Sequence, residues 1–396
     1  MHTTTAFRGL SCIDCDAAFD PADVTHRCPD CGGLLTAEYD RDGQVGDPTD
    51  LGDHRFEGVA RYADLLPFPA ERLVTMTEGG TPLVACPALA DDLGVGTVYV
   101  KDEARNPTGS VRDRGMAVAV TAALERGAAD VGLPTTGAGG HSAAAYAARA
   151  GLDSHSFVPS RATFDAKAMI NVHGGDMSVV EGRLADAQAA FADAVADEPW
   201  YSLAAFETPY RQEGQKTLAY ELADQLDGEL PDAVVSPTGQ GLGLVGLARG
   251  AADLQTMGLL EETPPLYAAQ AAGCAPIAAA FAAGRDRHEP VERPDTICGS
   301  IEVADPAGSP LVLDALRESG GGAVTAEDTE ILEAATSMAA ADGVELNPAS
   351  GAAVAGAREL VDRGDLGAGD TVVLVNTASA HKGADVLRSH LMSKGI

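Results

Sequence analysis

Short runs of β-branched residues alternate with longer amphipathic or alanine-rich stretches from about residue 98 onward. The apolar runs have the length of strands buried on both faces, and the stretches between them have the length and spacing of helices. Strands are predicted at 98–101, 156–158, 178–180, 233–236 and 371–375. Helices are predicted at 111–126, 162–173, 184–197, 213–226, 327–342 and 350–363. This alternation predicts an α/β fold with mostly parallel sheets covered by helices on both sides.

The chain of 396 residues is long enough for two lobes with cores of their own and a small appendage. Residues 40–55 are rich in Asp and Gly and are predicted to link the N-terminal segment to the main body, which begins near Arg61. The longest uncharged run, 263–284, contains Pro264, Pro265, Gln270 and Pro276 and consists largely of Ala and Gly. It is better interpreted as a buried strand followed by a core helix than as a membrane span. We therefore expect no membrane partner. We also expect no signal peptide, because the sequence does not open with a basic region followed by an apolar one.

The balance of charged residues indicates the environment of the protein and limits its partners. Acidic residues number 59 against 27 basic ones, for a net charge of −32 that is spread along the chain, and only five of the basic residues are lysine. Such a surface keeps a protein hydrated in concentrated salt, so we interpret the chain as a halophile's cytoplasmic protein; an ordinary acidic enzyme is the alternative. Either way the charge repels phosphate backbones, and we expect no nucleic-acid partner.

Four of the seven cysteines lie close together, in two pairs of the form Cys-x2-Cys: Cys12, Cys15, Cys28 and Cys31. This is the spacing of a zinc ribbon, in which two short turns supply four thiolates to a tetrahedral ion. Four thiolates leave no open coordination position, so the expected Zn²⁺ is structural. A redox pair or a disulfide is the competing interpretation, although nothing else in the sequence indicates an oxidising compartment.

A glycine-rich connection follows the predicted strand at 233–236. Gly239, Gly241 and Gly243 come before a predicted helix, where backbone N–H groups and the helix dipole can hold a phosphate. The same glycines also suit a tight structural turn, and the pattern alone does not decide between the two.

Several ordered segments together resemble the threonine synthase branch of the fold-type-II pyridoxal-phosphate enzymes, over essentially the whole chain. They are the cysteine ribbon, Glu-Gly-Gly-Thr-Pro-Leu at 78–83, Tyr-Val-Lys-Asp-Glu at 99–103, Asn-Pro-Thr-Gly-Ser-Val-Arg-Asp-Arg-Gly at 106–115, Glu-Gly-Gln-Lys-Thr at 213–217, the glycines at 239–243 and Asn-Pro-Ala-Ser-Gly-Ala-Ala at 347–353. The resemblance implies a two-lobed, tryptophan synthase β-like fold. It places a zinc ribbon at 1–45 and an enzyme-like body at 46–396, with a large lobe at about 46–105 and 206–396 and a small lobe at about 106–205.

The resemblance also implies roles for single residues. Position 112 is that of the lysine that holds the cofactor, Ala138 lies in the loop beside the cofactor ring, and Thr377 faces the pyridine nitrogen. Thr108 and Ser110 line the region for the substrate carboxylate or phosphate. The cofactor phosphate is held by the loop that contains Gly239, Gln240, Gly241, Leu242 and Gly243.

Two of these positions depart from the family pattern. Arg112 replaces the lysine, and a guanidinium is protonated at neutral pH in all but about one molecule in 10⁵, so it neither forms a Schiff base nor moves protons. Ala138 replaces an asparagine that hydrogen-bonds the ring hydroxyl. Lys101 and Lys216 occupy positions that relatives also carry in other roles, and Lys167 lies on a predicted surface helix, so none of them is expected to replace the missing lysine.

Two functions therefore stay open. In the first, the chain binds pyridoxal phosphate without a covalent bond and carries out an impaired form of the family reaction, O-phospho-L-homoserine to L-threonine and phosphate. In the second, it is an inactive relative that senses a small anionic amino acid or partners an active paralogue, with Arg112 pairing bidentately with the anion. The resemblance also implies a homodimer. A ribbon that recruits a protein partner is a further alternative to a structural ribbon.

Overall fold

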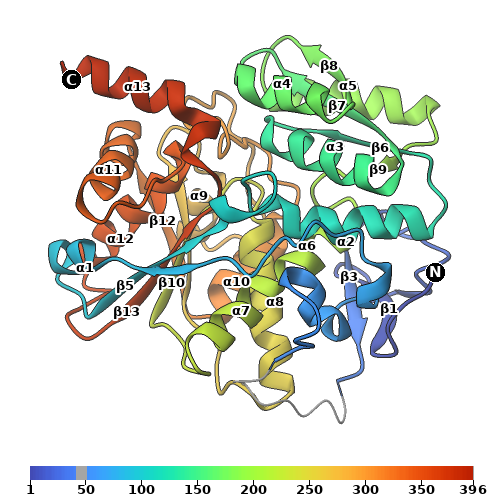
Figure 1. Cartoon of the computed structure of the whole chain (residues 1–396), viewed down its shortest axis with the longest axis horizontal. Helices are drawn as coiled ribbons and strands as arrows, with labels where there is room; N and C mark the ends of the chain where they lie inside the picture. The colour runs from blue at the N-terminus through green and yellow to red at the C-terminus, as the bar shows by residue number, and fades with distance from the viewer. Residues whose placement is uncertain (42–50, 396) are drawn as a thin grey trace.

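The computed structural model describes residues 1–41 and 51–395, so positions 42–50 of the predicted linker lie outside the described residues. This part of the chain forms three sheets, of six, four and three strands. Figure 1 shows the four-stranded sheet and its helices as a lobe beside the larger, six-stranded one.

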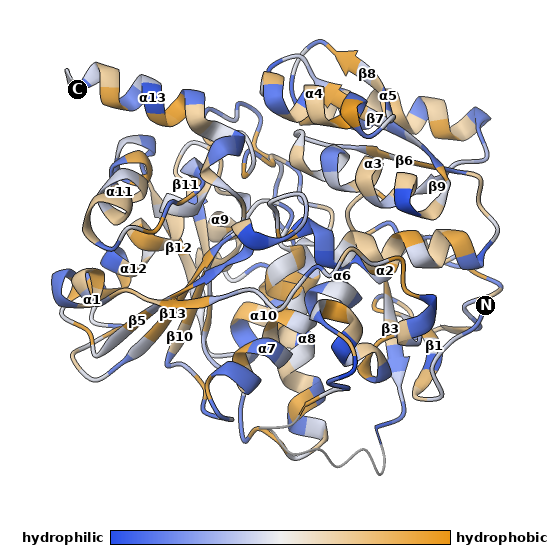
Figure 2. Cartoon of the chain, in the orientation of Figure 1, coloured by the Kyte–Doolittle hydropathy of each residue, from blue (hydrophilic) through white to orange (hydrophobic). Residues whose placement is uncertain are grey.

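The six-stranded sheet is parallel except at one edge, where β4 runs antiparallel to β5. Its strands, in spatial order, are β12 (Gly322–Ala326), β11 (Leu266–Ala271), β10 (Ala233–Pro237), β13 (Thr371–Asn376), β5 (Thr97–Asp102) and β4 (Leu83–Ala85). Successive residues of its central strands pack on opposite faces: Val234 and Val373 contact one helix layer, and Val235 and Val372 the other. Figure 2 shows that β5, β10 and β13 are largely hydrophobic.

Helices cover both faces of this sheet. One face carries α1 (Pro87–Leu93), α11 (Asp328–Ala341) and α12 (Gly351–Arg363). The other carries α7 (Thr217–Gln225), α8 (Leu242–Thr256), α9 (Pro276–Ala282) and α10 (Ser309–Glu318). The C-terminal helix α13 (Ala384–Ser393) follows the short 3-10 turn η5 (Ala380–Gly383). The remaining 3-10 turns are η1 (Gly58–Leu65), η2 (Ala70–Arg72), η3 (Glu103–Arg105) and η4 (Pro348–Ser350).

The smaller lobe is built on a parallel sheet in the order β8 (Asp176–Val180), β7 (Asp153–Pro159), β6 (Asp130–Pro134) and β9 (Tyr201–Ser202). On one face of the sheet, Val158 of β7 packs with Ile170 of α4 (Phe164–Val172), and α3 (Ala138–Ala150) covers the same face. On the opposite face, Phe157 contacts Phe191 of α5 (Leu184–Asp197). Helix α2 (Arg112–Glu125) lies between this lobe and α6 (Tyr210–Gln215). The first residue of α2 is thus held at the boundary of the two lobes.

The N-terminal sheet is antiparallel and consists of β1 (Phe7–Cys12), β2 (Ala18–Phe19) and β3 (Leu35–Tyr39). It is attached to the larger lobe by polar contacts. The Tyr39 hydroxyl donates to Glu213 Oε2 at 2.5 Å, and Arg249 Nη2 donates to the Ala37 carbonyl at 2.7 Å.

The predicted α/β fold is confirmed, since all five predicted strands fall within observed ones and the run at 263–284 forms β11 and α9. The helix predicted at 213–226 is instead divided into α6 and α7, which meet at Lys216. There the Lys216 N–H bonds the Glu213 carbonyl, a tighter turn than an α-helix makes. Gly214 lies so close to α2 that a Cβ would come within 2.0 Å of the Arg114 carbonyl oxygen, which the sequence periodicity does not reveal.

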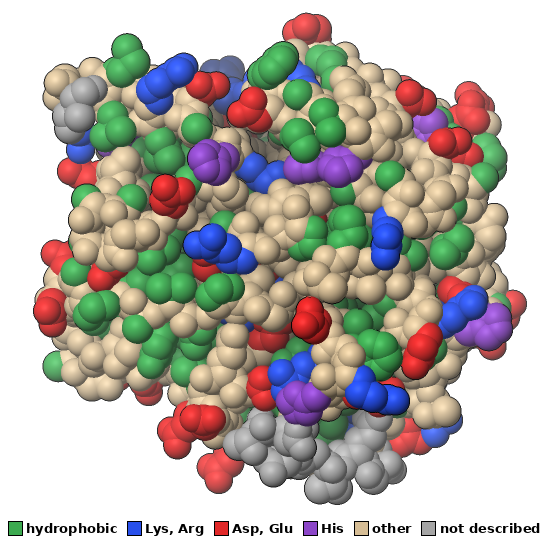
Figure 3. Space-filling view, in the orientation of Figure 1, with side chains coloured by type: hydrophobic (Ala, Val, Ile, Leu, Met, Phe, Trp, Pro, Cys, Tyr) green, Lys and Arg blue, Asp and Glu red, His purple; other side chains and the backbone are tan. Residues whose placement is uncertain are grey.

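None of the helices in the described ranges combines the length and apolar character needed to cross a membrane. Figure 3 shows carboxylate side chains scattered over the visible face rather than gathered in one patch. This distribution agrees with the spread of acidic residues along the sequence.

Candidate active site

A cavity of about 560 Å³ lies between the two lobes, at the carboxyl ends of β10 and β13. The predicted phosphate loop, Gly239 to Gly243, lines it together with Thr377 and Arg112. The sequence-predicted cofactor residues therefore come together here, apart from Ala138, which lines a second cavity. In an α/β sheet such a position, beyond the carboxyl ends of parallel strands, is where ligands usually bind.

The glycine loop has the shape that an anion site needs. Gly241 has φ of +87°, and a Cβ there would lie 2.2 Å from Val312 Cγ2, so only glycine fits. Helix α8 begins at the next residue, and its first N–H groups have no carbonyl within the helix to bond. A Cβ at Gly243 would meet nothing within 4 Å, so the backbone there is open to a ligand. The loop can therefore hold a phosphate or carboxylate.

Arg112 is the first residue of α2 and lines both cavities. Its Nη1 donates to Ser110 Oγ at 3.2 Å. Its side chain passes close to α3, because a Cβ added at Gly139 would lie 3.7 Å from Arg112 Cδ. Burial lowers its pKa, which the neighbouring Asp113 partly offsets. Within residues 1–41 and 51–395 no ion pair joins Arg112 to a carboxylate.

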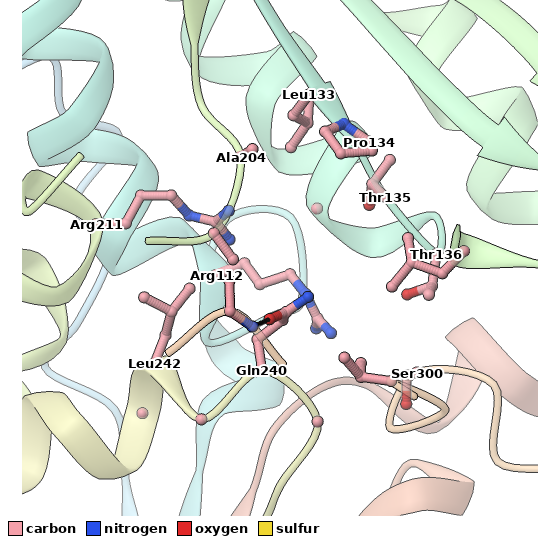
Figure 4. Close-up of a pocket in the computed structure, with 18 of the residues that line it drawn as sticks. Arg112, Leu133, Pro134, Thr135, Thr136, Ala204, Arg211, Gln240, Leu242 and Ser300 are labelled. Carbon is pink, nitrogen blue, oxygen red and sulfur yellow. Dashed lines mark hydrogen bonds between the residues drawn. The ribbon is translucent and has the colours of Figure 1, made fainter. Parts of the chain in front are cut away.

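A second arginine, Arg211 of α6, extends into the first cavity beside Arg112 (Figure 4). Its Nη1 donates to the Leu203 carbonyl at 2.8 Å, while its buried Nε has no hydrogen-bond partner in the described part of the chain. Burial, and then the charge of Arg112, lowers the pKa of Arg211 to about 9. Glu207 also lines this cavity but is paired with Arg27 at 2.9 Å. Because neither guanidinium has a carboxylate partner in the described ranges, the cavity is electropositive, although the protein as a whole is strongly acidic. The sequence analysis did not identify Arg211.

The second cavity, of about 330 Å³, adjoins the first at Arg112 and Thr136. Ala138 lines it with a methyl group only, so the structure offers no side-chain hydrogen bond at that position. Lys382 of η5 also lines it, and its Nζ donates to His141 Nδ1 at 2.8 Å. Burial and the charge of Arg112 lower the pKa of Lys382 to about 8, with Asp113 opposing them.

Lys382 is a residue that the sequence analysis missed. Among only five lysines, it follows the predicted strand at 371–375, and this position at the carboxyl end of a strand could have drawn attention to it. Lys101 and Lys216 line neither cavity; each lies in a buried ion-pair cluster, with Glu221 at 2.6 Å and Glu213 at 2.7 Å respectively.

The two predicted substrate residues lie beside the cavities rather than on their walls. Thr108 donates from its hydroxyl to Asp113 Oδ1 at 2.6 Å and from its backbone N–H to Oδ2 at 2.7 Å. Ser110 is fully buried and accepts from Arg112. Both hydroxyls thus organise the start of α2, and direct contact with a ligand stays a prediction.

The four N-terminal cysteines form one cluster, with their ligand atoms all within 4.8 Å of one another. The Sγ–Sγ distances are 3.5 Å for Cys12–Cys31, 3.7 Å for Cys15–Cys28 and 3.5 Å for Cys15–Cys31. Thiolates bound to Zn²⁺ at about 2.3 Å in a tetrahedron lie about 3.8 Å apart, so the arrangement fits such an ion. His26, between the two cysteine pairs, lines the first cavity.

Pyridoxal phosphate, the cofactor that the resemblance implies, fits this site at one end only. The glycine loop and the N-terminus of α8 suit its phosphate, and Thr377 lies in the same cavity. At its aldehyde end the residue needed is an amine, and Arg112 supplies a guanidinium instead. The residues present therefore do not fit the covalent attachment at position 112.

Comparison with known proteins agrees with the fold and with the family resemblance of the sequence. A family model described as "Pyridoxal-phosphate dependent enzyme" matches residues 74–378. Threonine synthase of Methanosarcina acetivorans is 38% identical over 369 residues, which cover 93% of this chain and 90% of that protein. Threonine synthase of Methanocaldococcus jannaschii is 35% identical over 378 residues, which cover 94% of this chain and 93% of that protein.

Solved structures share the architecture at low sequence identity. Maize serine racemase superposes with a TM-score of 0.67 at 17% identity, over 80% of this chain and 94% of its own. Diaminopropionate ammonia lyase of Escherichia coli superposes with a TM-score of 0.69 at 17% identity, over 81% of this chain and 89% of its own. These likenesses show the fold, and the family match over residues 74–378 together with the relatives at 35–38% identity establishes that the chain belongs to the family of pyridoxal-phosphate-dependent enzymes.

Proposed function

We propose that this protein is threonine-synthase-like, that its interlobe cleft binds a small anionic amino acid, and that the nominal reaction is impaired. That reaction converts O-phospho-L-homoserine and water to L-threonine and phosphate. The kinship rests on relatives that are named threonine synthase. The impairment rests on one observation: the side chain that enters the cleft at position 112 is a guanidinium.

Arginine removes two contributions from the family reaction. A permanently protonated group neither attacks an aldehyde nor takes a proton from a substrate carbon. Proton transfer by a well-placed side chain contributes typically about 10²–10⁴-fold in rate. Ala138 removes a hydrogen bond as well, so any bound pyridoxal phosphate is expected to be held by its phosphate and not covalently at position 112.

Anion binding is what the cleft retains. Arg112 and Arg211 share a cavity with the glycine loop and form no ion pair within the described ranges, so a carboxylate or phosphate can pair with either guanidinium. The same observation favours a second candidate function, that of an inactive relative that senses an anionic amino acid or partners an active paralogue. The two candidates differ only in whether turnover remains.

For the N-terminal segment we propose a structural Zn²⁺ held by Cys12, Cys15, Cys28 and Cys31. The sulfur–sulfur distances support it, and four thiolates leave no position for a substrate. The excess of acidic residues, 59 against 27 basic ones, supports the proposal of a protein adapted to concentrated salt.

Two measurements on the protein in concentrated salt test the function. Phosphate release from O-phospho-L-homoserine, with pyridoxal phosphate added, is expected to be at least about 10²-fold slower than in an active threonine synthase. Calorimetric titration with the same compound is expected to show binding that Arg112→Gln weakens, with Arg388→Gln, on the exposed face of α13, as control. Release at the rate of the active enzyme would refute the impairment, and absence of binding would refute the anion site.

A further inference from the structure

Lys382, His141 and His173 form a hydrogen-bonded row beside the second cavity. Lys382 Nζ donates to His141 Nδ1 at 2.8 Å, and His141 Nε2 lies 3.3 Å from His173 Nε2, with the two rings stacked. His141 is buried in α3, and His173, just past the end of α4, is half-buried. The row therefore leads from the wall of the cavity toward the solvent, through residues of three different elements.

The surroundings of the Lys382 amine favour its neutral form. It is half-buried, with Arg112 on the cavity side, and burial and this neighbouring cation lower its pKa to about 8. Asp113 of α2 acts in the opposite direction and outweighs Arg112, so burial is the main cause of the lowered pKa of Lys382. Desolvation is one of the recognised ways in which a protein turns a lysine into a nucleophile.

No other lysine in the described ranges has such a setting. Lys101 and Lys216 form buried ion pairs, Lys394 is paired with Glu333 at 3.0 Å on the surface, and Lys167 donates to the Ser160 carbonyl at 2.6 Å. Lys382 takes part in no ion pair within those ranges, and it is the lysine that lines a cavity with Arg112. In its charged form the Lys382 amine can only donate, so His141 Nδ1 then accepts this hydrogen bond; in its neutral form the amine has a lone pair that is available for nucleophilic attack.

We propose that Lys382 is a nucleophilic amine that binds a small aldehyde carrying an anionic group, as an imine, in the second cavity. The anion would pair with Arg112, which borders the same cavity and has no carboxylate of its own within the described residues. The aldehyde group belongs either to a pyridoxal-type cofactor or to a small substrate, such as a 2-oxo acid whose oxo group is an aldehyde. This inference does not rest on the proposed function, because it concerns an amine outside the position of the family lysine.

The chemistry balances without an oxidant or a metal. The neutral amine adds to the carbonyl carbon, and the carbonyl π electrons move to oxygen, which takes up a proton from the nitrogen. Loss of that oxygen as water then leaves a carbon–nitrogen double bond, so one amine and one aldehyde give one imine and one water. His141 is a positioning residue in this step: it fixes the direction of the amine, and its contact with His173 offers a path for exchange of the proton with solvent.

Reductive trapping tests the proposal. The unmodified protein is incubated with glyoxylate or with pyridoxal 5'-phosphate near neutral pH, reduced with borohydride and mapped by peptide mass spectrometry. With five lysines in the chain, each site can be followed separately. Lys382 is expected to be labelled at least about tenfold faster than Lys394, because Lys394 is paired with a carboxylate on the surface whereas Lys382 has a desolvated amine beside a cavity. Labelling by pyridoxal phosphate alone would indicate a cofactor aldehyde, and labelling by glyoxylate a substrate aldehyde; either supports the proposal.

Matched variants complete the test. Lys382→Arg keeps the charge and should abolish the fast label, whereas Lys167→Arg should leave it unchanged. His141→Leu should slow the label severalfold and shift its pH dependence, and His141→Gln, which keeps an acceptor, should restore part of the rate. Label spread evenly over the lysines, or no label with either aldehyde, would overturn the proposal. Because trapping does not measure turnover of O-phospho-L-homoserine, its result is independent of the phosphate-release assay.

Discussion

Glu302 pairs with Arg161 across the boundary between the two lobes, with 3.1 Å between Oε2 and Nη1. Arg161 follows β7 of the smaller lobe, and Glu302 lies between α9 and α10 of the larger one. Arg183, at the start of α5, pairs with the same carboxylate, whose side chain is only 5% exposed. Arg161 and Glu302 both line the second cavity. One carboxylate therefore ties two loops of the smaller lobe to the larger lobe at the edge of the cleft.

We expect Glu302→Gln to loosen this edge while leaving the fold intact. Because both arginines are more than one-third exposed, the loss in unfolding free energy should be modest, about 1 kcal/mol. Hydrogen exchange should rise around residues 160–163 and 296–302 more than elsewhere. Glu359→Gln, which breaks an exposed pair with Arg363, is the control and should change neither quantity. Equal exchange in the two variants would contradict the role of Glu302 as a link between lobes.

Arg112→Lys alone should restore little activity, and addition of Ala138→Asn should restore more. The reason is that the two departures affect the same cofactor: lysine returns the amine, and asparagine returns a hydrogen-bond donor at the wall where Ala138 has only a methyl group. Phosphate release from O-phospho-L-homoserine and the absorbance of bound pyridoxal phosphate measure the two effects separately. Arg317→Lys, on the surface of α10, controls for expression and handling. Full activity in the single variant would show that Ala138 has no part in the impairment.

Arg114 should be among the most costly residues to replace. It is fully buried and holds Glu103 at 2.7 Å and Glu221 at 2.6 Å, and Lys101 completes the cluster. Arg114→Met would leave Glu103 buried without its cationic partner, which typically costs about 3–5 kcal/mol. Denaturant unfolding measures this loss. Arg388→Met, which removes one member of an exposed pair, should stay within about 0.5 kcal/mol of the parent.

Glu78 should make the protein less stable as pH rises toward neutrality. Burial raises its pKa to about 7 from 4.5, although Met76 N–H and the Tyr146 hydroxyl hydrogen-bond the carboxylate. The folded chain thus binds this proton more tightly than the unfolded chain. The stability it contributes is complete below about pH 4.5 and is lost as the pH rises through about 7.

Glu78→Gln should therefore be more stable than the parent above pH 7, by up to about 3 kcal/mol, with a flatter pH dependence below it. Tyr146→Phe should act in the opposite direction, because it removes a hydrogen bond that favours the charged carboxylate. Chemical unfolding between pH 4.5 and 8 measures both variants. Identical slopes for Glu78→Gln and the parent would exclude this carboxyl as the source.

The sequence predicts several elements with clear periodicity and misses the alanine- and glycine-rich helix α3. β5, β10 and β13 are β-branched runs between turn residues, and α5 is found with its exact bounds at Leu184–Asp197. α3 was not predicted, because Ala and Gly dominate it and give no apolar stripe. Its glycines are needed for close packing: a Cβ at Gly140 would come within 2.8 Å of Ile170 Cδ1. Tertiary contact, rather than local pattern, explains that helix.

The residues of the candidate site are likewise predicted only in part from the sequence. The glycine loop and Arg112 are found because chain order and motif carry their signal. Arg211 and Lys382 are not, because what distinguishes them is the absence of a carboxylate partner within the described ranges and a shared border with Arg112. Such a property belongs to the folded arrangement of α2, α6 and η5 and has no counterpart in sequence spacing.

Removal of the proposed Zn²⁺ should affect the cleft as well as the ribbon, through His26. This residue lies between the two cysteine pairs, accepts a hydrogen bond from the Ser202 N–H at 3.1 Å, and contacts the Tyr201 ring with 5.2 Å between ring centroids. Burial lowers its pKa, so it is held as a neutral acceptor at the wall of the first cavity. Loss of the metal would free the loop that carries it, since a segment this small lacks a core of its own.

We therefore expect a chelator, or Cys28→Ser, to release Zn²⁺, to lower the unfolding temperature and to weaken binding of O-phospho-L-homoserine severalfold. His26→Gln separates the two effects, because it should weaken binding while metal content stays unchanged. Metal analysis, thermal unfolding and calorimetric titration on the same samples measure the three quantities. If metal loss left ligand affinity unchanged while the ribbon unfolded, His26 would have no role in shaping the cavity, and the ribbon would stabilise only itself.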